Sequence, residues 1–372
     1  MTRSTDSNQA EESWPGRSEP VSSSLISAPV CVMGCGGIGG TVAAELALAG
    51  HQVSVVEAST DHLTAIRTSG LYYDGLNASH RVQFHAAVAS DELRALRGVV
   101  ILAVKSQHTD AAIDQLLPHL DADTVVVSLQ NGWNANRIAE RIGTKRTIGA
   151  MVHLVGTYLG PGHVRRFSRG DLYIGEMDGT DTHRVHEIRE ILAKVTRTHT
   201  TRNVRGYIWS KQIYGCTMPV SALVDQPARE IFAPDWVKTI LLGLILEGIQ
   251  VADVLGVHLE PYERYDPQAM RITSADHLPV AIAMLPHGSS KGNSGVWHDI
   301  KRGRRTEIDH LQGEIVHLGQ RHGLPMTLNA EVVSMIHEIE SGQREMSWAN
   351  LQRLREPAQS LVDEVIRSHM SG

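Results

Sequence analysis

The distribution of apolar and polar positions divides the chain into two halves of different character. In the first half, short apolar runs alternate with helical patterns, and the runs fall at residues 30–33, 53–56, 99–104 and 124–129. Continuous apolar runs of this length are typical of strands buried on both faces, and their alternation with helices indicates a parallel sheet. We also expect a small-residue helix at residues 41–49 and further strands at residues 146–155 and 171–175.

Helical patterns dominate after residue 203, where strand-like runs almost vanish. We expect long helices at residues 209–224, 235–255, 305–322, 330–341 and 347–370. Gly256, Gly323 and Gly342 follow three of them, as glycines commonly do at helix ends. The apolar stretch 241–254 predicts a buried helix, either in the core or at the interface of a homodimer.

The first 28 residues have a different composition from the rest. They are rich in Ser, Glu, Asn and Pro and show no apolar period. Such a segment cannot bury enough surface to offset the entropy of ordering. The sequence therefore predicts a disordered tail at residues 1–28, an α/β domain at residues 29–202 and a mostly α-helical domain at residues 203–372.

Composition narrows the class of partner. The 372 residues carry 35 Lys and Arg against 41 Asp and Glu, a formal charge of −6. This balance argues against nucleic acid and membrane surfaces, which need a basic face, and no run approaches the roughly 18 apolar residues of a membrane span. The three cysteines, Cys31, Cys35 and Cys216, make neither a disulfide framework nor a metal-ligand pattern, so we expect a reducing cytoplasm and no metal. Only seven of the basic residues are Lys, which favours a chemical role for each of them.

A glycine-rich loop follows the first predicted strand and precedes the first predicted helix. It fits the pattern G-x-G-x-x-G with Gly34, Cys35, Gly36, Gly37, Ile38 and Gly39. In this pattern the first Gly makes a tight turn, the second lets the backbone approach a pyrophosphate, and the third lets helix and strand pack closely. The pyrophosphate binds the N–H groups at the helix N-terminus. We interpret the loop as a dinucleotide site of Rossmann type; the alternative is a glycine-rich turn with a structural role only.

Glu57 closes the second strand, 23 residues after Gly34. A carboxylate there accepts hydrogen bonds from the adenosine ribose hydroxyls and repels a 2′-phosphate. The next residues, 58–60, offer no Arg to hold that phosphate. We therefore expect NAD in preference to NADP. The alternatives are a solvated Glu57 and a phosphate contact from Arg67.

Polar residues follow two more strands. Lys105 comes after the run 99–104, and Asn131 comes after the run 124–129. Ligands of open α/β sheets bind at the carboxyl ends of strands, so both side chains are candidates to contact cofactor or substrate. The alternatives are a surface cation for Lys105 and an Asn-Gly turn for Asn131.

Together these segments resemble the ketopantoate reductase (2-dehydropantoate 2-reductase) family. The matching segments are residues 34–40, 103–106, 129–132, 209–211, 294–300 and 305–309, in an order that holds from about residue 29 to residue 355. The resemblance implies a Rossmann domain followed by a helical domain, with the active site between them. It further implies that Lys211 donates the proton to the ketone oxygen, that Glu307 anchors cofactor and substrate, and that Asn131 contacts the nicotinamide side. The alternatives are an exposed helical lysine for Lys211 and a carboxylate stabilised by a helix dipole for Glu307.

The departures from the family pattern concern the substrate. Family members have an Asn four residues after the Lys, where this chain has Gly215, and a second Asn before the Pro that is also missing here. A late family Ser aligns with Gly295, which leaves Ser294 as the nearest hydroxyl. We therefore expect Lys211, Gly215 and Ser294 to face a hydroxy or oxo compound other than ketopantoate.

Four other features of the sequence have weaker functional interpretations. The pairs His183/His186 and His317/His322 suit a metal only weakly, because no carboxylate completes a ligand set. His298 and His310 flank the late motif and are candidates for the cleft. Cys35 lies at a helix N-terminus, which lowers a thiol pKa, so a redox role competes with that of a small residue filling the loop. The basic run 302–305 is a solvated face or a phosphate contact.

The sequence thus predicts an NAD(P)-dependent oxidoreductase that moves a hydride between the nicotinamide and a ketone or secondary alcohol of a small molecule. Lys211 is the expected proton donor or acceptor, with Glu307 and Asn131 in positioning roles. The first alternative is ketopantoate reduction with NADPH in pantothenate biosynthesis. A rival of another class is a regulatory protein that senses the dinucleotide without turnover.

Overall fold

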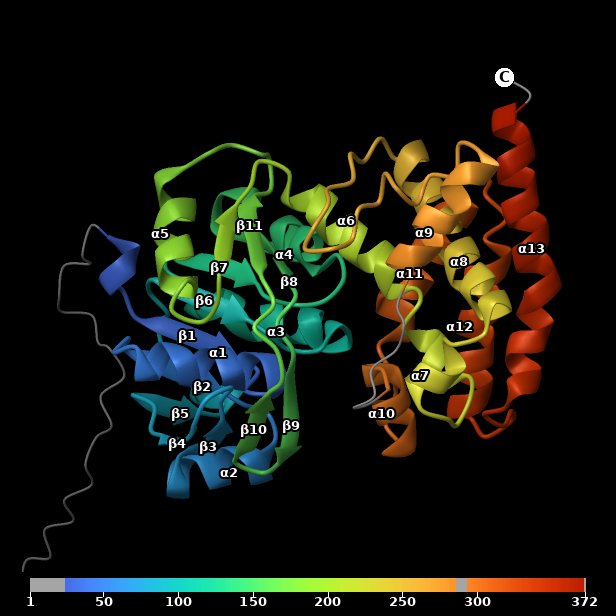
Figure 1. The fold of residues 1–372 in the computed structure, drawn as a ribbon. Coiled ribbons are helices and arrows are strands. Elements are labelled where there is room, and N and C mark those ends of the chain that lie inside the picture. The colour runs from blue at the N-terminus through green and yellow to red at the C-terminus, as the bar shows by residue number, and fades with distance from the viewer. Residues whose placement is uncertain (1–23, 286–292, 371–372) are drawn as a thin grey trace, which may run out of the picture.

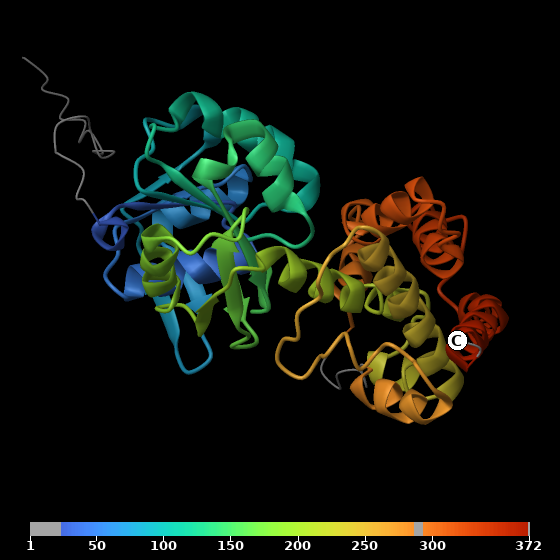
Figure 2. The same cartoon turned by 90° about the horizontal axis from the view of Figure 1, so that it is seen from above.

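The structure, a computed structural model, describes residues 24–285 and 293–370. Figure 1 shows an α/β part at the left and a helical part at the right. Both views show α6 (Val204–Gly215) leading from the sheet into the helical part (Figures 1 and 2). The last strand ends at Thr200, three residues ahead of this helix.

The α/β part is built on an eight-stranded sheet with the order β12-β11-β8-β7-β6-β1-β2-β5. Its strands are β1 (Val30–Met33), β2 (Val53–Val56), β5 (Ala86–Val88), β6 (Val99–Leu102), β7 (Val125–Ser128), β8 (Thr147–Val152), β11 (Leu172–Glu176) and β12 (Thr198–Thr200). The predicted parallel sheet is confirmed from β5 to β8, whereas β11 pairs antiparallel with β8. Every residue of β1, β2, β6 and β7 is buried, as their apolar runs predict.

Helices cover both faces of this sheet. Alternate residues of a strand point to opposite faces, so Val30 and Val32 pack with α1 (Gly37–Leu48) and α5 (His183–Leu192). Cys31 and Met33 pack on the other face with α3 (Thr109–Leu116) and α4 (Asn134–Ile142). A further helix, α2 (Thr60–Ser69), follows β2. The layers bring the carboxyl ends of β1, β2, β6 and β7 to one edge.

A second sheet was not predicted. Its order is β4-β3-β10-β9, formed by β3 (Leu71–Asp74), β4 (Ser79–Val82), β9 (Gly156–Gly160) and β10 (His163–Arg166). These strands lack apolar runs because their burial is partial: three of the four residues of β4 are exposed. The sheet packs on α1, where Gly37 and Gly156 meet so closely that a Cβ on either would lie 2.2 Å from the carbonyl oxygen of the other.

The helical part has one core around α8 (Asp235–Val254). The other helices after α6 are α7 (Ala228–Ile231), α9 (Leu278–Met284), α10 (Gly295–Lys301), α11 (Gln312–Arg321), α12 (Thr327–Glu340) and α13 (Trp348–Met370). Helix α8 packs against α11, α12 and α13, so the apolar stretch 241–254 belongs to the core of its own chain. The apolar stretch therefore gives no support to a homodimer, which stays a prediction. No helix within residues 24–285 and 293–370 combines the length and apolar character that a membrane crossing needs.

Two predicted helices have different bounds. Helix α6 begins at Val204, where the Asn203 side chain caps it, and ends at Gly215, ahead of a 3-10 turn at Pro219–Ala222. The helix predicted from residue 305 begins only at Gln312, because residues 308–310 form a 3-10 turn of their own. The late motif therefore lies in a turn, not on a long helix.

Only the last five residues of the predicted tail belong to the described part of the chain. Residues 1–23 lie outside the described part of the chain, but residues 24–28 are ordered. They form a 3-10 turn, η1 (Leu25–Ser27), that docks on α5. The Ser24 hydroxyl and the Leu25 N–H donate to Glu187 Oε1 at 2.6 and 3.0 Å. Their assignment to a disordered tail was wrong, because a buried carboxylate on α5 gives this short segment two partners.

Candidate active site

The glycine loop lies between β1 and α1 with the geometry that dinucleotide binding requires. Gly34 has a φ of +92°, which favours glycine at this turn. A Cβ on Gly36 would meet no atom within 4 Å, so this backbone faces open space, whereas a Cβ on Gly39 would lie 1.9 Å from the Gly34 carbonyl oxygen. These three environments match the turn, the close approach to a phosphate and the helix–strand contact. The loop therefore fits a dinucleotide.

Glu57 follows β2 and braces this loop. Its Oε2 accepts a hydrogen bond from the Cys35 N–H at 3.0 Å, and its Oε1 accepts one from the Ser59 N–H at 2.8 Å. Arg67 is engaged elsewhere: its Nε donates to the Ala87 carbonyl oxygen at 2.7 Å, and its guanidinium pairs with Glu92. A carboxylate thus lies at the end of β2, where the sequence predicts the adenosine ribose, and the Arg67 cation is paired elsewhere.

Cys35 is a structural residue of the loop. Its side chain is fully buried, and this burial raises the pKa of the thiol. The expected lowering by the helix N-terminus was wrong because burial and the Glu57 carboxylate both raise the pKa of this thiol.

Lys211 lies on α6 and projects to the ends of β7 and β8. Its Nζ donates to Asn131 Oδ1 at 2.5 Å and to the Val152 carbonyl oxygen. Burial lowers the pKa of Lys211 to about 8, and the Glu307 carboxylate opposes that shift. The ammonium is therefore held by two oxygens at the sheet edge and titrates near neutral pH.

Two more contacts join the domains at this edge. Glu307 Oε1 accepts from the Ser106 N–H at 2.8 Å, and Lys105 Nζ lies 2.7 Å from Asp299 Oδ2 on α10. The Ser106 hydroxyl in turn donates to the Asn131 carbonyl oxygen at 3.1 Å. The structure thus places Lys105, Asn131, Lys211 and Glu307 together at the boundary between the sheet edge and the helical part.

Gly215 and Ser294, which we expect to face the substrate with Lys211, have different surroundings. Gly215 lies one helical turn after Lys211, and a Cβ added there would meet only Gln212 Oε1, at 3.9 Å. Ser294 caps α10 through the Trp297 N–H at 3.3 Å and shares a 2.9 Å hydrogen bond with the Ser221 hydroxyl. Gly215 therefore leaves open space on the Lys211 side of the helix, while the Ser294 hydroxyl has local partners.

Three residues of the site were missed. Val152 acts through its backbone carbonyl, which leaves no sequence signal. Ser106 and Asp299 lie inside the quoted motifs, but nothing in the sequence places them against Glu307 and Lys105. For His298 and His310 the structure gives no contact with Lys211, and no three His, Cys, Asp or Glu side chains among the described residues form a metal-ligand group.

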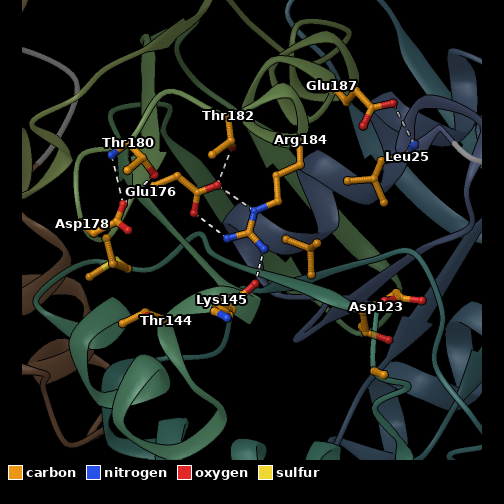
Figure 3. Close-up of a pocket in the computed structure, with 14 residues that line it drawn as sticks. Leu25, Asp123, Thr144, Lys145, Glu176, Asp178, Thr180, Thr182, Arg184 and Glu187 are labelled. Carbon is orange, nitrogen blue, oxygen red and sulfur yellow. Dashed lines mark hydrogen bonds and ion pairs between the residues drawn. The ribbon is translucent and has the colours of Figure 1, made fainter.

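A separate hollow of about 590 Å³ opens at the opposite edge of the sheet (Figure 3). It lies near the start of β7, whereas Asn131 follows the end of that strand. Its central polar groups satisfy one another, because Glu176 accepts from Thr182 and pairs with the Arg184 guanidinium. No predicted site residue lines this hollow.

Known proteins share both parts of this architecture. The family described as ketopantoate reductase PanE/ApbA matches residues 30–179, and its C-terminal counterpart matches residues 203–340. A 2-dehydropantoate 2-reductase of Pyrococcus horikoshii is 28% identical over 315 residues, covering 84% of this chain and 97% of the relative.

Solved structures of related proteins share the fold of both parts of the chain. A PanE/ApbA family ketopantoate reductase from Ralstonia eutropha JMP134 superimposes with a TM-score of 0.73 at 28% identity, covering 85% of this chain and all of that one. D-mandelate dehydrogenase, solved with NADH and anilino(oxo)acetate, has the same fold: its TM-score is 0.73 at 18% identity, over 84% of this chain and 99% of that one. The chain therefore belongs to the ketopantoate reductase family of NAD(P)-dependent oxidoreductases.

Proposed function

We propose that this chain transfers a hydride between NAD and the carbonyl or carbinol carbon of a hydroxy or oxo acid, with Lys211 as the proton donor or acceptor. The observation that carries this proposal is the Lys211 ammonium itself. It is held 2.5 Å from Asn131 at the sheet edge, with its pKa lowered to about 8. A general acid is most effective when its pKa lies near the working pH.

Each polar group of the cleft has a defined task in this proposal. The reduced nicotinamide, when bound, supplies the hydride. Lys211 protonates the oxygen on which negative charge develops, and Asn131 and the Val152 carbonyl fix the direction of its ammonium. Glu307 holds the Ser106 backbone of the cofactor edge and keeps a negative charge near the ammonium.

The preference for NAD rests on the charges at the adenosine corner. The Glu57 carboxylate is held there by the Cys35 and Ser59 N–H groups and would repel a 2′-phosphate. The guanidinium of Arg67 is paired with Glu92. We expect a higher kcat/KM with NADH than with NADPH; a large preference for NADPH would contradict the assignment and favour the biosynthetic alternative.

The substrate we propose is larger than ketopantoate. By resemblance to the family, side chains that bind ketopantoate are missing from this chain. Gly215 leaves open space in place of one of them, and the Ser294 hydroxyl is hydrogen-bonded to Ser221. Efficient turnover of ketopantoate would contradict this proposal while leaving the hydride chemistry intact. A screen of 2-oxo and 2-hydroxy acids, followed through NADH absorbance, tests it directly.

Replacing Lys211 separates an enzyme from a dinucleotide-sensing regulator. We expect Lys211→Ala to lower kcat by about 10²- to 10⁴-fold, the usual contribution of a general acid, and to leave NADH binding within about twofold. Binding is measured by nucleotide fluorescence and turnover by NADH absorbance. Lys238→Ala, on α8 and paired with Asp235, is the control for loss of a lysine. Unchanged turnover in Lys211→Ala would refute the assignment.

A further inference from the structure

The segment from Asp299 on α10 to Glu307, ahead of α11, lies against the sheet edge where β6 ends. It is anchored at both ends on the loop after β6: Asp299 pairs with Lys105 at 2.7 Å, and Glu307 accepts from Ser106 at 2.8 Å. Strand β6 pairs with β1, which carries the glycine loop. Residues 300–306, from the helical domain, are therefore held next to the dinucleotide site of the other domain.

This segment is basic, and its cations have unequal partners. Lys301 lies 2.6 Å from Asp225, and Arg305 lies 3.1 Å from Asp309. Within the described residues, Arg302 and Arg304 are both exposed and neither belongs to an ion pair, but only Arg304 acts on the Tyr158 hydroxyl beside the glycine loop. The Arg304 backbone N–H donates to the Asp299 carbonyl oxygen at 2.8 Å, so the residue is fixed directly beside the Lys105 anchor.

The Arg304 charge acts on the Tyr158 hydroxyl, as do two acidic side chains, Glu57 after β2 and Asp61 on α2. Burial raises the pKa of Tyr158 on β9; Arg304 opposes that rise, and Glu57 and Asp61 add to it, so all three charges act on one hydroxyl. The Tyr158 ring packs edge-on against His62 at 4.9 Å. His62 Nε2 in turn lies 2.8 Å from the Cys35 carbonyl oxygen of the glycine loop.

We propose that Arg304 binds the adenosine-side phosphate of the dinucleotide from across the domain cleft, which rests on the dinucleotide binding in the proposed function. A guanidinium matches phosphate oxygens with two parallel hydrogen bonds, and this one has no competing carboxylate partner. The N–H groups at the start of α1 hold the pyrophosphate from the other side. The cofactor is thus gripped by both domains, and the helical domain contributes affinity as well as chemistry. Glu57 directs this contact to the pyrophosphate, because its carboxylate repels a 2′-phosphate.

The test measures direct binding of ADP-ribose, 2′-phospho-ADP-ribose and reduced nicotinamide mononucleotide to the full chain by calorimetry. We expect Arg304→Ala to weaken ADP-ribose binding by about 10- to 100-fold, as for the loss of a charge-assisted pair, and to leave the mononucleotide within about twofold. Arg304→Lys keeps a point charge without the planar fork and should recover part of the affinity. Arg305→Ala, the neighbour paired with Asp309, is the matched control and should bind like the parent.

The outcomes separate this inference from the function on which it rests. If the parent chain binds no ADP-ribose, both fail; if the parent binds it and Arg304→Ala binds equally well, only the role of Arg304 is refuted. A loss shared by both adenosine ligands supports the pyrophosphate contact. A loss of affinity confined to 2′-phospho-ADP-ribose refutes the pyrophosphate contact and shows that Arg304 binds the 2′-phosphate of NADP instead. Equal losses in Arg304→Ala and Arg305→Ala would show a general effect of charge and also refute it.

Discussion

In the proposed mechanism, the single ammonium of Lys211 sets the pH dependence of the reaction. Its pKa is about 8, so it is protonated below that pH and neutral above it. Ketone reduction consumes the proton, so we expect its kcat to be flat below pH 8 and to fall about tenfold per pH unit above it. Alcohol oxidation needs the neutral amine and should show the opposite limb, rising up to pH 8. Initial rates in both directions from pH 6 to 10 measure this.

The matched variant for this profile is Lys211→Arg. A guanidinium keeps its proton above pH 12, so its residual activity should show no break near pH 8. A break that persists in this variant would assign the titration to another group.

We propose that Gly215 sets the size of the substrate that fits beside Lys211. It lies at i+4 from Lys211, so its missing side chain leaves space on the same face of α6. We expect Gly215→Asn to lower kcat/KM for a phenyl-substituted 2-oxo acid by about tenfold or more relative to ketopantoate, since filling a pocket discriminates on this scale. The ratio of the two kcat/KM values is the readout. Gly215→Ala adds one methyl group and should give an intermediate ratio, and an unchanged ratio in Gly215→Asn would contradict the role.

The contact between α1 and β9 fixes the helix that begins the cofactor site. A Cβ on Gly156 would lie 2.2 Å from the Gly37 carbonyl oxygen, a backbone atom that has no rotamer to change. We expect Gly156→Ala to lower the free energy of unfolding by about 1–3 kcal/mol, as overpacking does, measured by urea denaturation. Gly160→Ala, on the same strand, is the control, because a Cβ added at Gly160 would meet no atom within 4 Å. Equal losses in the two variants would show that the strand propensity of glycine, and not the contact with Gly37, determines the change in the free energy of unfolding.

This contact also shows where sequence patterns stop being informative. The four central strands were predicted because each is an uninterrupted apolar run buried on both faces. The strands of the small sheet are half-exposed, and Gly37 and Gly156 are 119 positions apart, so neither their strands nor their contact leaves a local signal. Lys211 and Glu307 were found through family motifs, but the Val152 carbonyl and the Asp299 partner of Lys105 depend on the tertiary fold.

The two domains meet through contacts that also build the site. Asn131 with Lys211, Ser106 with Glu307, and Lys105 with Asp299 each pair a strand-end residue with a residue of the helical part. We therefore expect the proposed site to be sensitive to the relative position of the domains. We infer that changes in domain contact act on kcat even when they touch neither cofactor nor substrate.

His153 and Glu263 form a domain contact next to the Lys211 ammonium. His153 Nδ1 lies 2.7 Å from Glu263 Oε1, and the preceding residue, Val152, supplies the carbonyl that holds Lys211. Glu263 has a φ of +49°, a strained value for a residue with a side chain, and this geometry places its carboxylate at the domain boundary. We expect His153→Gln and Glu263→Gln each to lower kcat by about tenfold with little change in KM for NADH, because Lys211 loses its alignment.

The double variant decides whether these two residues act as one unit. If the contact positions the Val152 carbonyl, His153→Gln combined with Glu263→Gln should be no slower than either single variant, because either change alone already breaks the pair. Arg264→Gln, an exposed neighbour on the same loop, is the control for a change of charge and should leave kcat unchanged. Multiplying losses in the double variant would mean that the two residues act independently, and the coupling between domain contact and proton donor would then lie elsewhere in the cleft.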